Sequence, residues 1–172
     1  MNPVPEKLIN FRVYLDGNDL LGVADVQLPD LEPITDTVKG AGIAGEVESP
    51  VIGHFGSMGL TINWRTIEKN VAVLAQPKAH SLDLRGSQQV YDAGAGQYKS
   101  VPVRVVVRAV PKKTGIGKFD MGSTTDTSNE FEVTYIKVYI NGKREVEIDK
   151  FNYICYISGT DFLASVRRDL GL

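Results

Sequence analysis

The sequence predicts a mainly β fold: an antiparallel β-barrel or sandwich with one short internal helix, a C-terminal helix and long loops. Segments that alternate between apolar and polar residues recur along the chain, and turn-forming residues separate them. Helical spacing occurs in only two short stretches. With 172 residues the chain is long enough for one domain with a hydrophobic core, so we expect a single domain over residues 1–172.

The alternating segments mark the expected strands. They cover residues 11–15, 21–28, 60–64, 81–91, 101–110, 131–140, 144–148 and 151–157. Asn141-Gly142 lies between two of these segments and is a strong short-range signal for a β-hairpin with a tight turn. Strands do not alternate with long helices, so a parallel sheet is not expected.

Two helices are predicted, over residues 66–75 and 161–170. Apolar residues recur at helical spacing in both: Ile67, Val71 and Leu74 in the first, and Leu163, Val166 and Leu170 in the second. Thr66 and Asp161 are candidate N-caps, and Gly171 stands where a C-terminal capping glycine is expected.

Two long segments lack a regular pattern. Residues 29–56 are acidic at their start and contain five glycines, and residues 111–129 are polar and rich in Gly, Ser and Thr. Structureless loops of this length are uncommon in compact domains and usually bind something. We therefore interpret both as assembly loops that become ordered against a partner.

The charge balance excludes a general nucleic-acid binder, because the net charge is −2 and such proteins carry a marked basic excess. The charge is uneven, with eight acidic residues between Asp16 and Glu48 against the single base Lys39. Cys155 is the only cysteine, so an intrachain disulfide and a cysteine-based zinc site are excluded. The sequence shows no signal-peptide core and no apolar run of roughly 20 residues, so we expect assembly in a cytoplasm.

The search for catalytic or cofactor motifs gives no candidate site. Gly40-Ala41-Gly42-Ile43-Ala44-Gly45 matches G-x-G-x-x-G, but residues 35–39 are a poor strand and Pro50 prevents a long helix after the motif. His54 and His80 lack a second ligand at metal spacing, and we interpret both as turn or surface residues. We predict no enzyme activity, no cofactor and no metal.

Basic residues are the remaining candidates for ligand binding. Lys112, Lys113 and Lys118 lie near glycines, but the order of a phosphate-binding loop is absent. Four arginines are candidates to face phosphates: Arg104, Arg108, Arg167 and Arg168. Capping, protection of strand edges and pairing between subunits are the interpretations we favour for them.

The two ends of the chain carry a family resemblance. The C-terminal segments are Glu147-Ile148-Asp149-Lys150-Phe151-Asn152, Ile157-Ser158-Gly159-Thr160-Asp161, Leu163-Ala164-Ser165-Val166-Arg167 and Leu170-Gly171-Leu172. The N-terminal segments are Pro5-Glu6-Lys7-Leu8-Ile9-Asn10-Phe11, Leu28-Pro29-Asp30-Leu31 and the glycine motif with Glu46, before Gly53-His54. Together they resemble the major tail tube proteins of contractile-tailed phages and related bacteriocin-like particles.

This resemblance implies a structural virion protein of the tail, assembled in the host bacterial cytoplasm. In that family, six-membered rings stack into a hollow tube that carries DNA or an effector when the sheath contracts. The implied partners are copies of the same chain, the sheath protein, the tape-measure protein, and terminator and baseplate proteins, with DNA passing through the lumen without sequence-specific binding.

The two long loops and the basic residues give the expected assembly interface. It comprises Asp30, Glu32, Asp36, Lys39, Gly40, Gly42, Gly45, Glu46, Glu48, Lys112, Lys113, Lys118, Arg167 and Arg168. We expect the acidic segment of residues 16–48 of one copy to meet basic groups of the next, because like-charged faces repel. The candidate basic partners are Lys112, Lys113, Lys118, Lys143, Arg144, Arg167 and Arg168. In the alternative interpretation these acids line the lumen and repel DNA.

Other functional classes remain open at this stage. A generic β-sandwich binding module has the same strand pattern and also lacks a catalytic motif, and reversible behaviour without rings or rods would favour it. A lipocalin-like carrier would be a monomer with a copurifying ligand. The chain alone does not separate a phage tail from a DNA-free bacteriocin-like particle.

Overall fold

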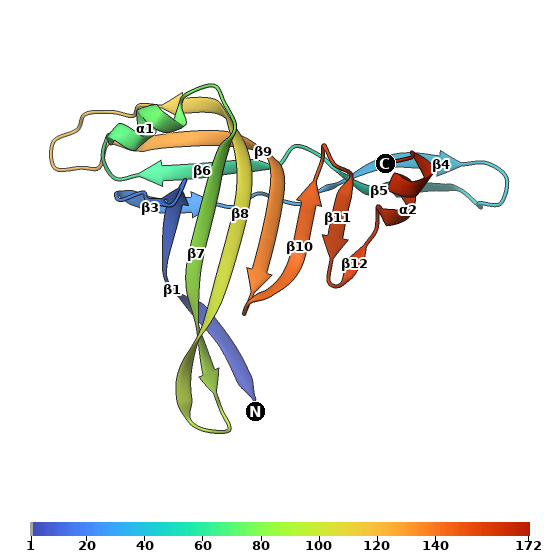
Figure 1. Cartoon of the computed structure of the whole chain (residues 1–172), viewed down its shortest axis with the longest axis horizontal. Helices are drawn as coiled ribbons and strands as arrows, with labels where there is room; N and C mark the ends of the chain where they lie inside the picture. The colour runs from blue at the N-terminus through green and yellow to red at the C-terminus, as the bar shows by residue number, and fades with distance from the viewer. Residues whose placement is uncertain (1) are drawn as a thin grey trace.

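The computed structural model describes residues 2–172, and its architecture is mainly β, as the sequence predicts (Figure 1). The strands are β1 (Pro3–Leu15), β2 (Asn18–Asp19), β3 (Val23–Gln27), β4 (Pro33–Lys39), β5 (Glu46–Phe55), β6 (Gly59–Trp64), β7 (His80–Asp92), β8 (Gln97–Gly115), β9 (Thr127–Ile140), β10 (Lys143–Asp149), β11 (Ile154–Ile157) and β12 (Thr160–Asp161). The helices are α1 (Lys69–Leu74) and α2 (Ala164–Asp169).

One large antiparallel sheet contains every strand except β4 and β5. Its main path runs β12-β11-β10-β9-β8-β7-β1-β2, and β6 joins β9 to β3 off this path. The second half of β9 pairs with β10, whereas its first half pairs with β6, and β8 accompanies it along both halves. Figure 1 shows the consequence: β8 and β9 run from the upright part of the sheet into a layer that crosses it.

The bend between the two layers coincides with irregular pairing. Register shifts between β8 and β9 occur at Arg108/Ala109 and at Pro111/Lys113. An extra residue in one strand increases the local twist and bends the strand, which lets one sheet fold over itself. The result is a sandwich with one continuous hydrogen-bonded connection between its layers.

The core fills the space between the layers. Its largest fully buried side chains are Trp64, Phe131, Met58, Leu60, Ile62, Leu74 and Leu82. The indole nitrogen of Trp64 donates to Asn129 Oδ1 (2.8 Å), and Asn129 Nδ2 donates to the carbonyl of Val71 in α1 (3.3 Å). Buried polar groups need such partners, so this network connects α1 to β6 and β9 inside the core.

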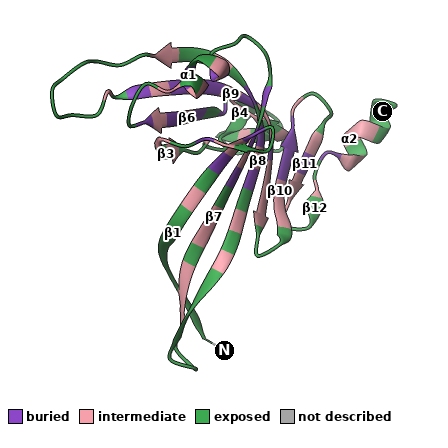
Figure 2. Ribbon diagram, turned by 60° about the vertical axis from the view of Figure 1, so that its left-hand side comes forward, coloured by how far each residue is buried: buried purple, intermediate pink, exposed green. Residues whose placement is uncertain are grey.

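Two arms leave the core (Figure 1), and the burial colouring in Figure 2 shows that the arm at the N-terminus is largely exposed or half-buried. One is made of the first part of β1 with the paired ends of β7 and β8, and residues 2–10 are exposed. The other is the separate two-stranded sheet of β4 and β5, in which no residue is buried. Both arms therefore leave most of their side chains exposed or half-buried.

The prediction that residues 29–56 are irregular was wrong. Most of this segment forms the hairpin of β4 and β5, including residues 35–39, which read as a poor strand. Strand signals in the sequence depend on burying one face, and all seven residues of β4 are exposed, so the alternation is missing. The second predicted loop is shorter than expected, because β8 extends to Gly115 and β9 begins at Thr127.

Other expectations needed smaller corrections. The helices are shorter than predicted, and neither Glu68 nor Leu163, the N-cap residues, makes a side-chain capping bond. His80 is buried at the start of β7, where its ring meets Phe131 edge-on, so the surface assignment was wrong. The Asn141-Gly142 turn was confirmed: both residues have positive φ, as a tight hairpin turn requires.

Candidate assembly surfaces

The β4–β5 hairpin gathers most of the acidic residues predicted for the interface. Asp36 and Lys39 lie on β4, Glu46 and Glu48 lie on β5, and Glu32 directly precedes the hairpin. All are exposed, and the one ion pair within the hairpin joins Lys39 Nζ to Glu46 Oε1 at 3.9 Å. The carboxylates are thus presented together to solvent on an arm that projects from the body (Figure 1).

The glycine motif forms the tip of this hairpin. Gly40, Gly42 and Gly45 all have positive φ, and a Cβ at any of them would meet no atom within 4 Å. The glycines therefore serve the turn and not a close packing contact. A dinucleotide site needs this motif between a strand and a helix, but here it connects two antiparallel strands.

The base of the hairpin packs against the C-terminal region. A Cβ at Gly53 of β5 would lie 2.5 Å from Cγ of Leu163, so only glycine admits the Leu163 side chain. Leu163 is buried although it precedes a helix with no buried residue. This contact orients the hairpin relative to β11, β12 and α2.

The predicted basic residues fall in two places. Lys112 and Lys113 lie near the end of β8, where Lys112 pairs with Glu132 (3.9 Å). Lys118 pairs with Asp126 (3.4 Å) in the loop of residues 116–126, and this loop lies at the opposite end of the molecule from the tip of the β4–β5 hairpin (Figure 1). Arg167 and Arg168 lie on α2, beside the hairpin base. Because Arg167 bonds Asp161 and the carbonyl of Tyr153 within the same chain (2.7 and 2.6 Å), it is engaged inside the protomer.

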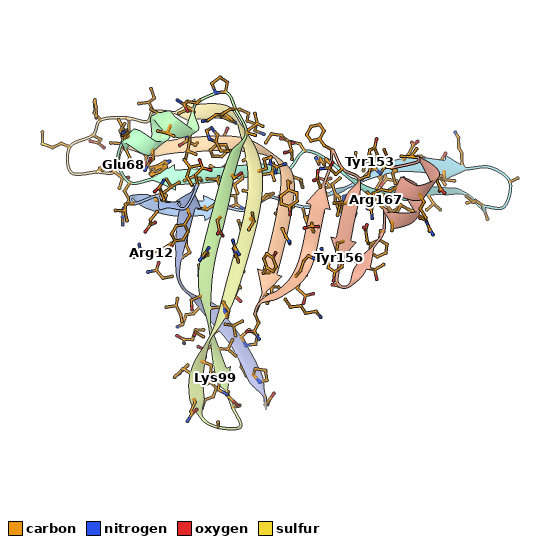
Figure 3. All side chains as sticks on the ribbon, viewed as in Figure 1. Arg12, Glu68, Lys99, Tyr153, Tyr156 and Arg167 are labelled. Carbon is orange, nitrogen blue, oxygen red and sulfur yellow. The ribbon has the colours of Figure 1, made fainter. Side chains whose placement is uncertain are left out.

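A second surface covers the side of the large sheet that faces away from the core. We call it the arginine–tyrosine face, and it comprises Arg12, Tyr14, Asp83, Arg85, Arg104, Val106, Arg108, Tyr135, Lys137, Tyr139, Arg144, Glu147 and Tyr156. Residues that alternate with these, such as Leu84, Val105 and Ile136, are buried in the core. Arg12 and Tyr156 label the two sides of this face in Figure 3.

Strand register aligns the charged groups of this face. Arg85 is opposite Arg104, which is opposite Tyr139, and Asp83 lies between the two guanidinium groups. Arg104 binds Asp83 through two bonds, Nε to Oδ1 (3.0 Å) and Nη2 to Oδ2 (2.9 Å), and Arg85 Nη2 binds the same Oδ2 (2.9 Å). Fork-like bonds of this kind hold the planar groups in a defined orientation.

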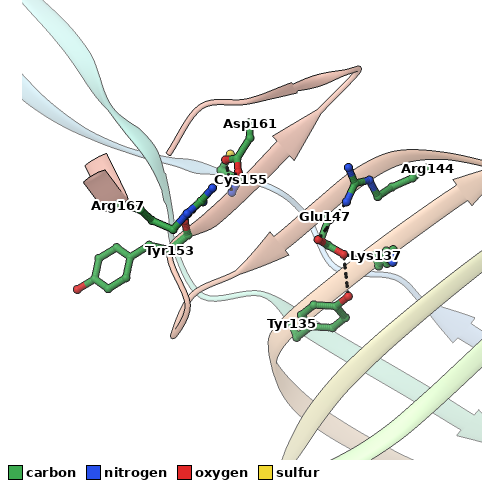
Figure 4. A network of polar contacts seen from close by, with 8 residues as sticks. All are labelled: Tyr135, Lys137, Arg144, Glu147, Tyr153, Cys155, Asp161 and Arg167. Carbon is green, nitrogen blue, oxygen red and sulfur yellow. Dashed lines mark hydrogen bonds and ion pairs between the residues drawn. The ribbon is translucent and has the colours of Figure 1, made fainter. Parts of the chain in front are cut away.

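A matching cluster lies further along the face, around Glu147 (Figure 4). The hydroxyl of Tyr135 donates to Glu147 Oε2 (2.9 Å), and Lys137 and Arg144 form ion pairs with the same carboxylate at 3.4 and 3.3 Å. The guanidinium of Arg144 also stacks on Tyr156, 3.7 Å from the ring centroid. Each carboxylate of the two clusters therefore has at least two donor residues, at least one of them from a neighbouring strand.

These contacts shift acid–base equilibria. Burial of Asp83 alone would raise its pKa, but the bonds from Arg104 and Arg85 outweigh burial and the pKa lies below its ordinary value. Burial, aided by the bond to Glu147, raises the pKa of Tyr135 to about 12. The bond from Arg167 lowers the pKa of Asp161. The two aspartates thus remain ionised and the tyrosine neutral across ordinary pH.

Three residues of this face, Arg104, Arg108 and Arg144, were among the candidates predicted from the sequence. The signal that was available is the period of two in β8 and β9, where Arg104, Arg108, Tyr135 and Tyr139 alternate with apolar residues. What the sequence could not show is which strands are neighbours, and the clusters exist only because β7, β8, β9 and β10 are adjacent.

Comparison with known proteins places this architecture in a family. Residues 5–171 match the phage tail tube protein FII family. The chain belongs to that family. The tail tube protein of Escherichia phage P2 is 30% identical, over 98% of this chain and 99% of the relative. The major tail tube protein of Serratia phage KSP20 is 23% identical, over 88% of this chain and 86% of the relative.

A solved structure supports the fold of this tail tube protein. The chain resembles one in the cryo-EM structure of the sheath/tube terminator of the PVC extracellular contractile injection system in its extended state. The TM-score is 0.55 with 14% sequence identity, covering 79% of this chain and 97% of that chain. The predicted fold class and family are therefore confirmed, and the protein is a structural component of the virion tail, not an enzyme.

Two further findings concern residues 2–172. None of the helices in that range is long and apolar enough to cross a membrane. The same range holds no group of three or more His, Cys, Asp or Glu side chains arranged to bind a metal ion.

Proposed function

We propose that copies of this tail tube protein close into six-membered rings, and that the rings stack into the inner tube through which DNA or an effector passes when the sheath contracts. The observation that carries the proposal is the β4–β5 hairpin. An isolated two-stranded hairpin is marginally stable in water, and this one buries no residue in its own chain. A neighbouring copy would supply the surface that the hairpin lacks.

The large sheet supports ring closure. Its two ends, at β12 and at β1 with β2, have unpaired edges. Unpaired edges recruit further strands, and a head-to-tail contact repeated around an axis closes a ring. Edge-to-edge joining would make the sheets of successive copies one continuous wall.

The arginine–tyrosine face supports an assignment of the lumen. The other side of this sheet is covered by the core, whereas this face is open to solvent and available to line an inner surface. Arg85, Arg104 and Arg144 are bound to carboxylates. Their guanidinium groups and that of Arg108 lie over tyrosine rings. Guanidinium groups that are already paired in this way would bind DNA phosphates more weakly. Weak binding is what an inner surface needs if DNA is to pass along it.

The remaining partners follow from the place of a tube in a contractile tail. The sheath surrounds the tube, terminator and baseplate proteins close its ends, and the tape-measure protein fills its lumen before contraction. The relative from the PVC injection system is a sheath/tube terminator, which is consistent with end-capping partners of similar fold.

Removal of the hairpin tests the assembly proposal. Replacing residues 35–48 by a short Gly-Ser turn should leave a folded monomer that forms no tubes, because these residues do not contribute to the core. Negative-stain microscopy measures tube formation, and circular dichroism with thermal unfolding checks the fold. Normal tubes from this variant would reject a role of the hairpin in assembly. An unfolded variant would show that the hairpin is needed for the protomer itself to fold.

A further inference from the structure

The β4–β5 hairpin is joined to the body through an irregular stretch of β5. Phe55 pairs with Pro33, and the next pair along the hairpin is Pro50 with Thr35. Between these two pairs, residues 51–54 of β5 lie opposite a single residue of β4. A bulge interrupts the ladder of hydrogen bonds and lets a strand bend. The direction in which the hairpin projects therefore depends on the conformation of residues 51–54.

The bulge separates a fixed neck from an outer part that is bonded only to itself. At the neck, Gly56 N–H donates to the carbonyl of Glu32 (2.9 Å), and Lys150 Nζ donates to the carbonyl of Gly56 (2.7 Å). Within the described chain, the hydrogen bonds and the ion pair of residues 35–50 join residues of the hairpin to one another. No polar bond of the protomer thus holds the outer part at a given angle to the body in residues 2–172.

The side chain of Leu163 fills the bulge. Gly53 has a φ of +67°, and a Cβ there would lie 2.5 Å from Cγ of Leu163 and 2.7 and 2.9 Å from its two Cδ atoms. Leu163 is only 3% exposed, although it lies outside the main core of the sandwich. Gly53 and Leu163 line one cavity of about 140 Å³, together with Phe55 and Tyr153. Leu163 is therefore buried at the bulge and not in the sandwich core.

Polar bonds within the C-terminal segment hold Leu163 in place (Figure 4). The N–H groups of Leu163 and Cys155 donate to Asp161 Oδ1 (3.1 and 3.4 Å). Arg167 donates to Asp161 Oδ2 (2.7 Å) and to the carbonyl of Tyr153 (2.6 Å). Bonds between charged groups of this kind fix geometry as well as adding stability. The segment therefore presents the Leu163 side chain to Gly53 from a defined position.

We propose that Leu163 is a positioning residue for assembly: it fills the bulge at Gly53 and so fixes the direction in which the β4–β5 hairpin projects toward a neighbouring copy. The inference rests on the proposed role of the hairpin in assembly. A hairpin that moves freely loses conformational entropy when it binds, and holding it in one direction beforehand reduces that cost.

Distances between spin labels test the position of the hairpin in dilute, unassembled protein. The labels are attached in a Cys155→Ala background through Val47→Cys on β5 and Ala72→Cys on α1. Pulsed EPR should give one narrow distance distribution for this reference chain. Leu163→Ala should broaden the distribution. Leu170→Ala, the same truncation at a position that is 56% exposed, is the matched control and should leave it unchanged.

A substitution on the hairpin side separates positioning from simple support of the C-terminal segment. Gly53→Ala leaves Leu163 in place, so the new Cβ should displace the hairpin and shift the mean distance. Adding Leu163→Ala removes the clash and should reverse this shift. Leu163→Met, which conserves the side-chain volume, should keep the narrow distribution. An unchanged distribution in Leu163→Ala, or an unchanged mean distance in Gly53→Ala, would overturn the inference. If Leu163→Ala does not fold, Gly53→Ala decides alone.

Assembly measurements connect the position of the hairpin to tube formation. Leu163→Ala should raise the concentration for half-maximal assembly about tenfold, and Leu170→Ala should not change it. Equal assembly of the two variants would overturn the role of Leu163 even if the distance distribution is broadened. Normal tubes from the chain that lacks residues 35–48 would instead reject the proposed function of the hairpin, and this inference with it.

Discussion

Two hairpins of this tail tube protein have similar local structure and different surroundings. The β9–β10 hairpin turns at Asn141-Gly142 and contributes Phe131, Val133, Ile136 and Ile148 to the core. The β4–β5 hairpin turns at a glycine-rich tip and has no buried residue, and of its side chains only Phe55, at the end of β5, packs against the core. Backbone hydrogen bonding is thus a poor guide to where the protomer's stability lies. The first hairpin is part of the fold, and the second is available to a neighbour.

The largest expected difference between the two hairpins is the loss of monomer stability when a side chain of each is truncated. Phe131→Ala in β9 should lower the free energy of unfolding by about 3–5 kcal/mol, because it removes a completely buried ring. Val47→Ala on β5, where the side chain is 51% exposed, is the matched control and should stay within about 0.5 kcal/mol. Urea denaturation of the monomer measures both. Equal losses would show that the hairpin belongs to the cooperative unit.

The turns provide a second test with a smaller effect. Gly142→Ala should cost about 1–2 kcal/mol, since φ is +78° and a side chain there is strained although no atom lies within 4 Å. Gly40→Ala, at φ +123° and equally free of contacts, should leave the unfolding of the monomer unchanged and reduce tube formation. The expected difference arises because the hairpin tip makes no contact with the core. A stability loss at Gly40 as large as that at Gly142 would contradict this.

The pH dependence of stability gives a further test, because the ion pair on the large sheet and the ion pair on the β4–β5 hairpin should respond differently to acid. The pKa of Asp83 is lower in the folded protein than in the unfolded chain, where it is about 3.9. The ionised Asp83 therefore stabilises the fold fully above that unfolded value, and this stabilisation is lost as pH falls through the folded-state pKa. Asp83→Asn should cost about 1 kcal/mol at neutral pH and weaken the fall in stability below about pH 4.

Glu46→Gln is the control for Asp83→Asn. The side chains of the Lys39–Glu46 pair are 72% and 66% exposed, so its loss should not change monomer stability at any pH. Thermal unfolding measured across the acid range compares the two variants. An identical acid response in the Asp83 variant and the wild type would show that other carboxylates dominate.

The smallest effect per residue is expected from charges on the projecting arm. Reversing Asp30, Glu32 and Asp36 to lysine should leave the monomer intact and weaken assembly at low salt, because each exposed pair contributes only about 0–1 kcal/mol. The difference from the wild type should disappear above roughly 0.5 M salt, where screening is strong. Light scattering across salt concentrations measures assembly. Salt-insensitive assembly with unchanged tube yield would favour the alternative that these acids line the lumen.

Much of the body could be predicted from the sequence, because its strands bury one face. Residues 60–64 and 131–140 alternate in the sequence for the same reason that Leu60, Ile62 and Phe131 are buried in the structure. The Asn141-Gly142 turn depends only on local backbone preference, so it was also readable. β4 buries neither of its faces, so its sequence shows no alternation, and the prediction that this segment is irregular was wrong.

The sequence by itself determined the β class, the main strands, the C-terminal helix and the family. Tertiary structure alone decided which strands are neighbours, and with them the clusters around Asp83 and Glu147. It also decided that the loop of residues 116–126 and the tip of the β4–β5 hairpin lie at opposite ends of the molecule. The physical reason is that alternation records only whether a side chain faces the core. Register and bends come from pairing between distant segments, which a local pattern does not encode.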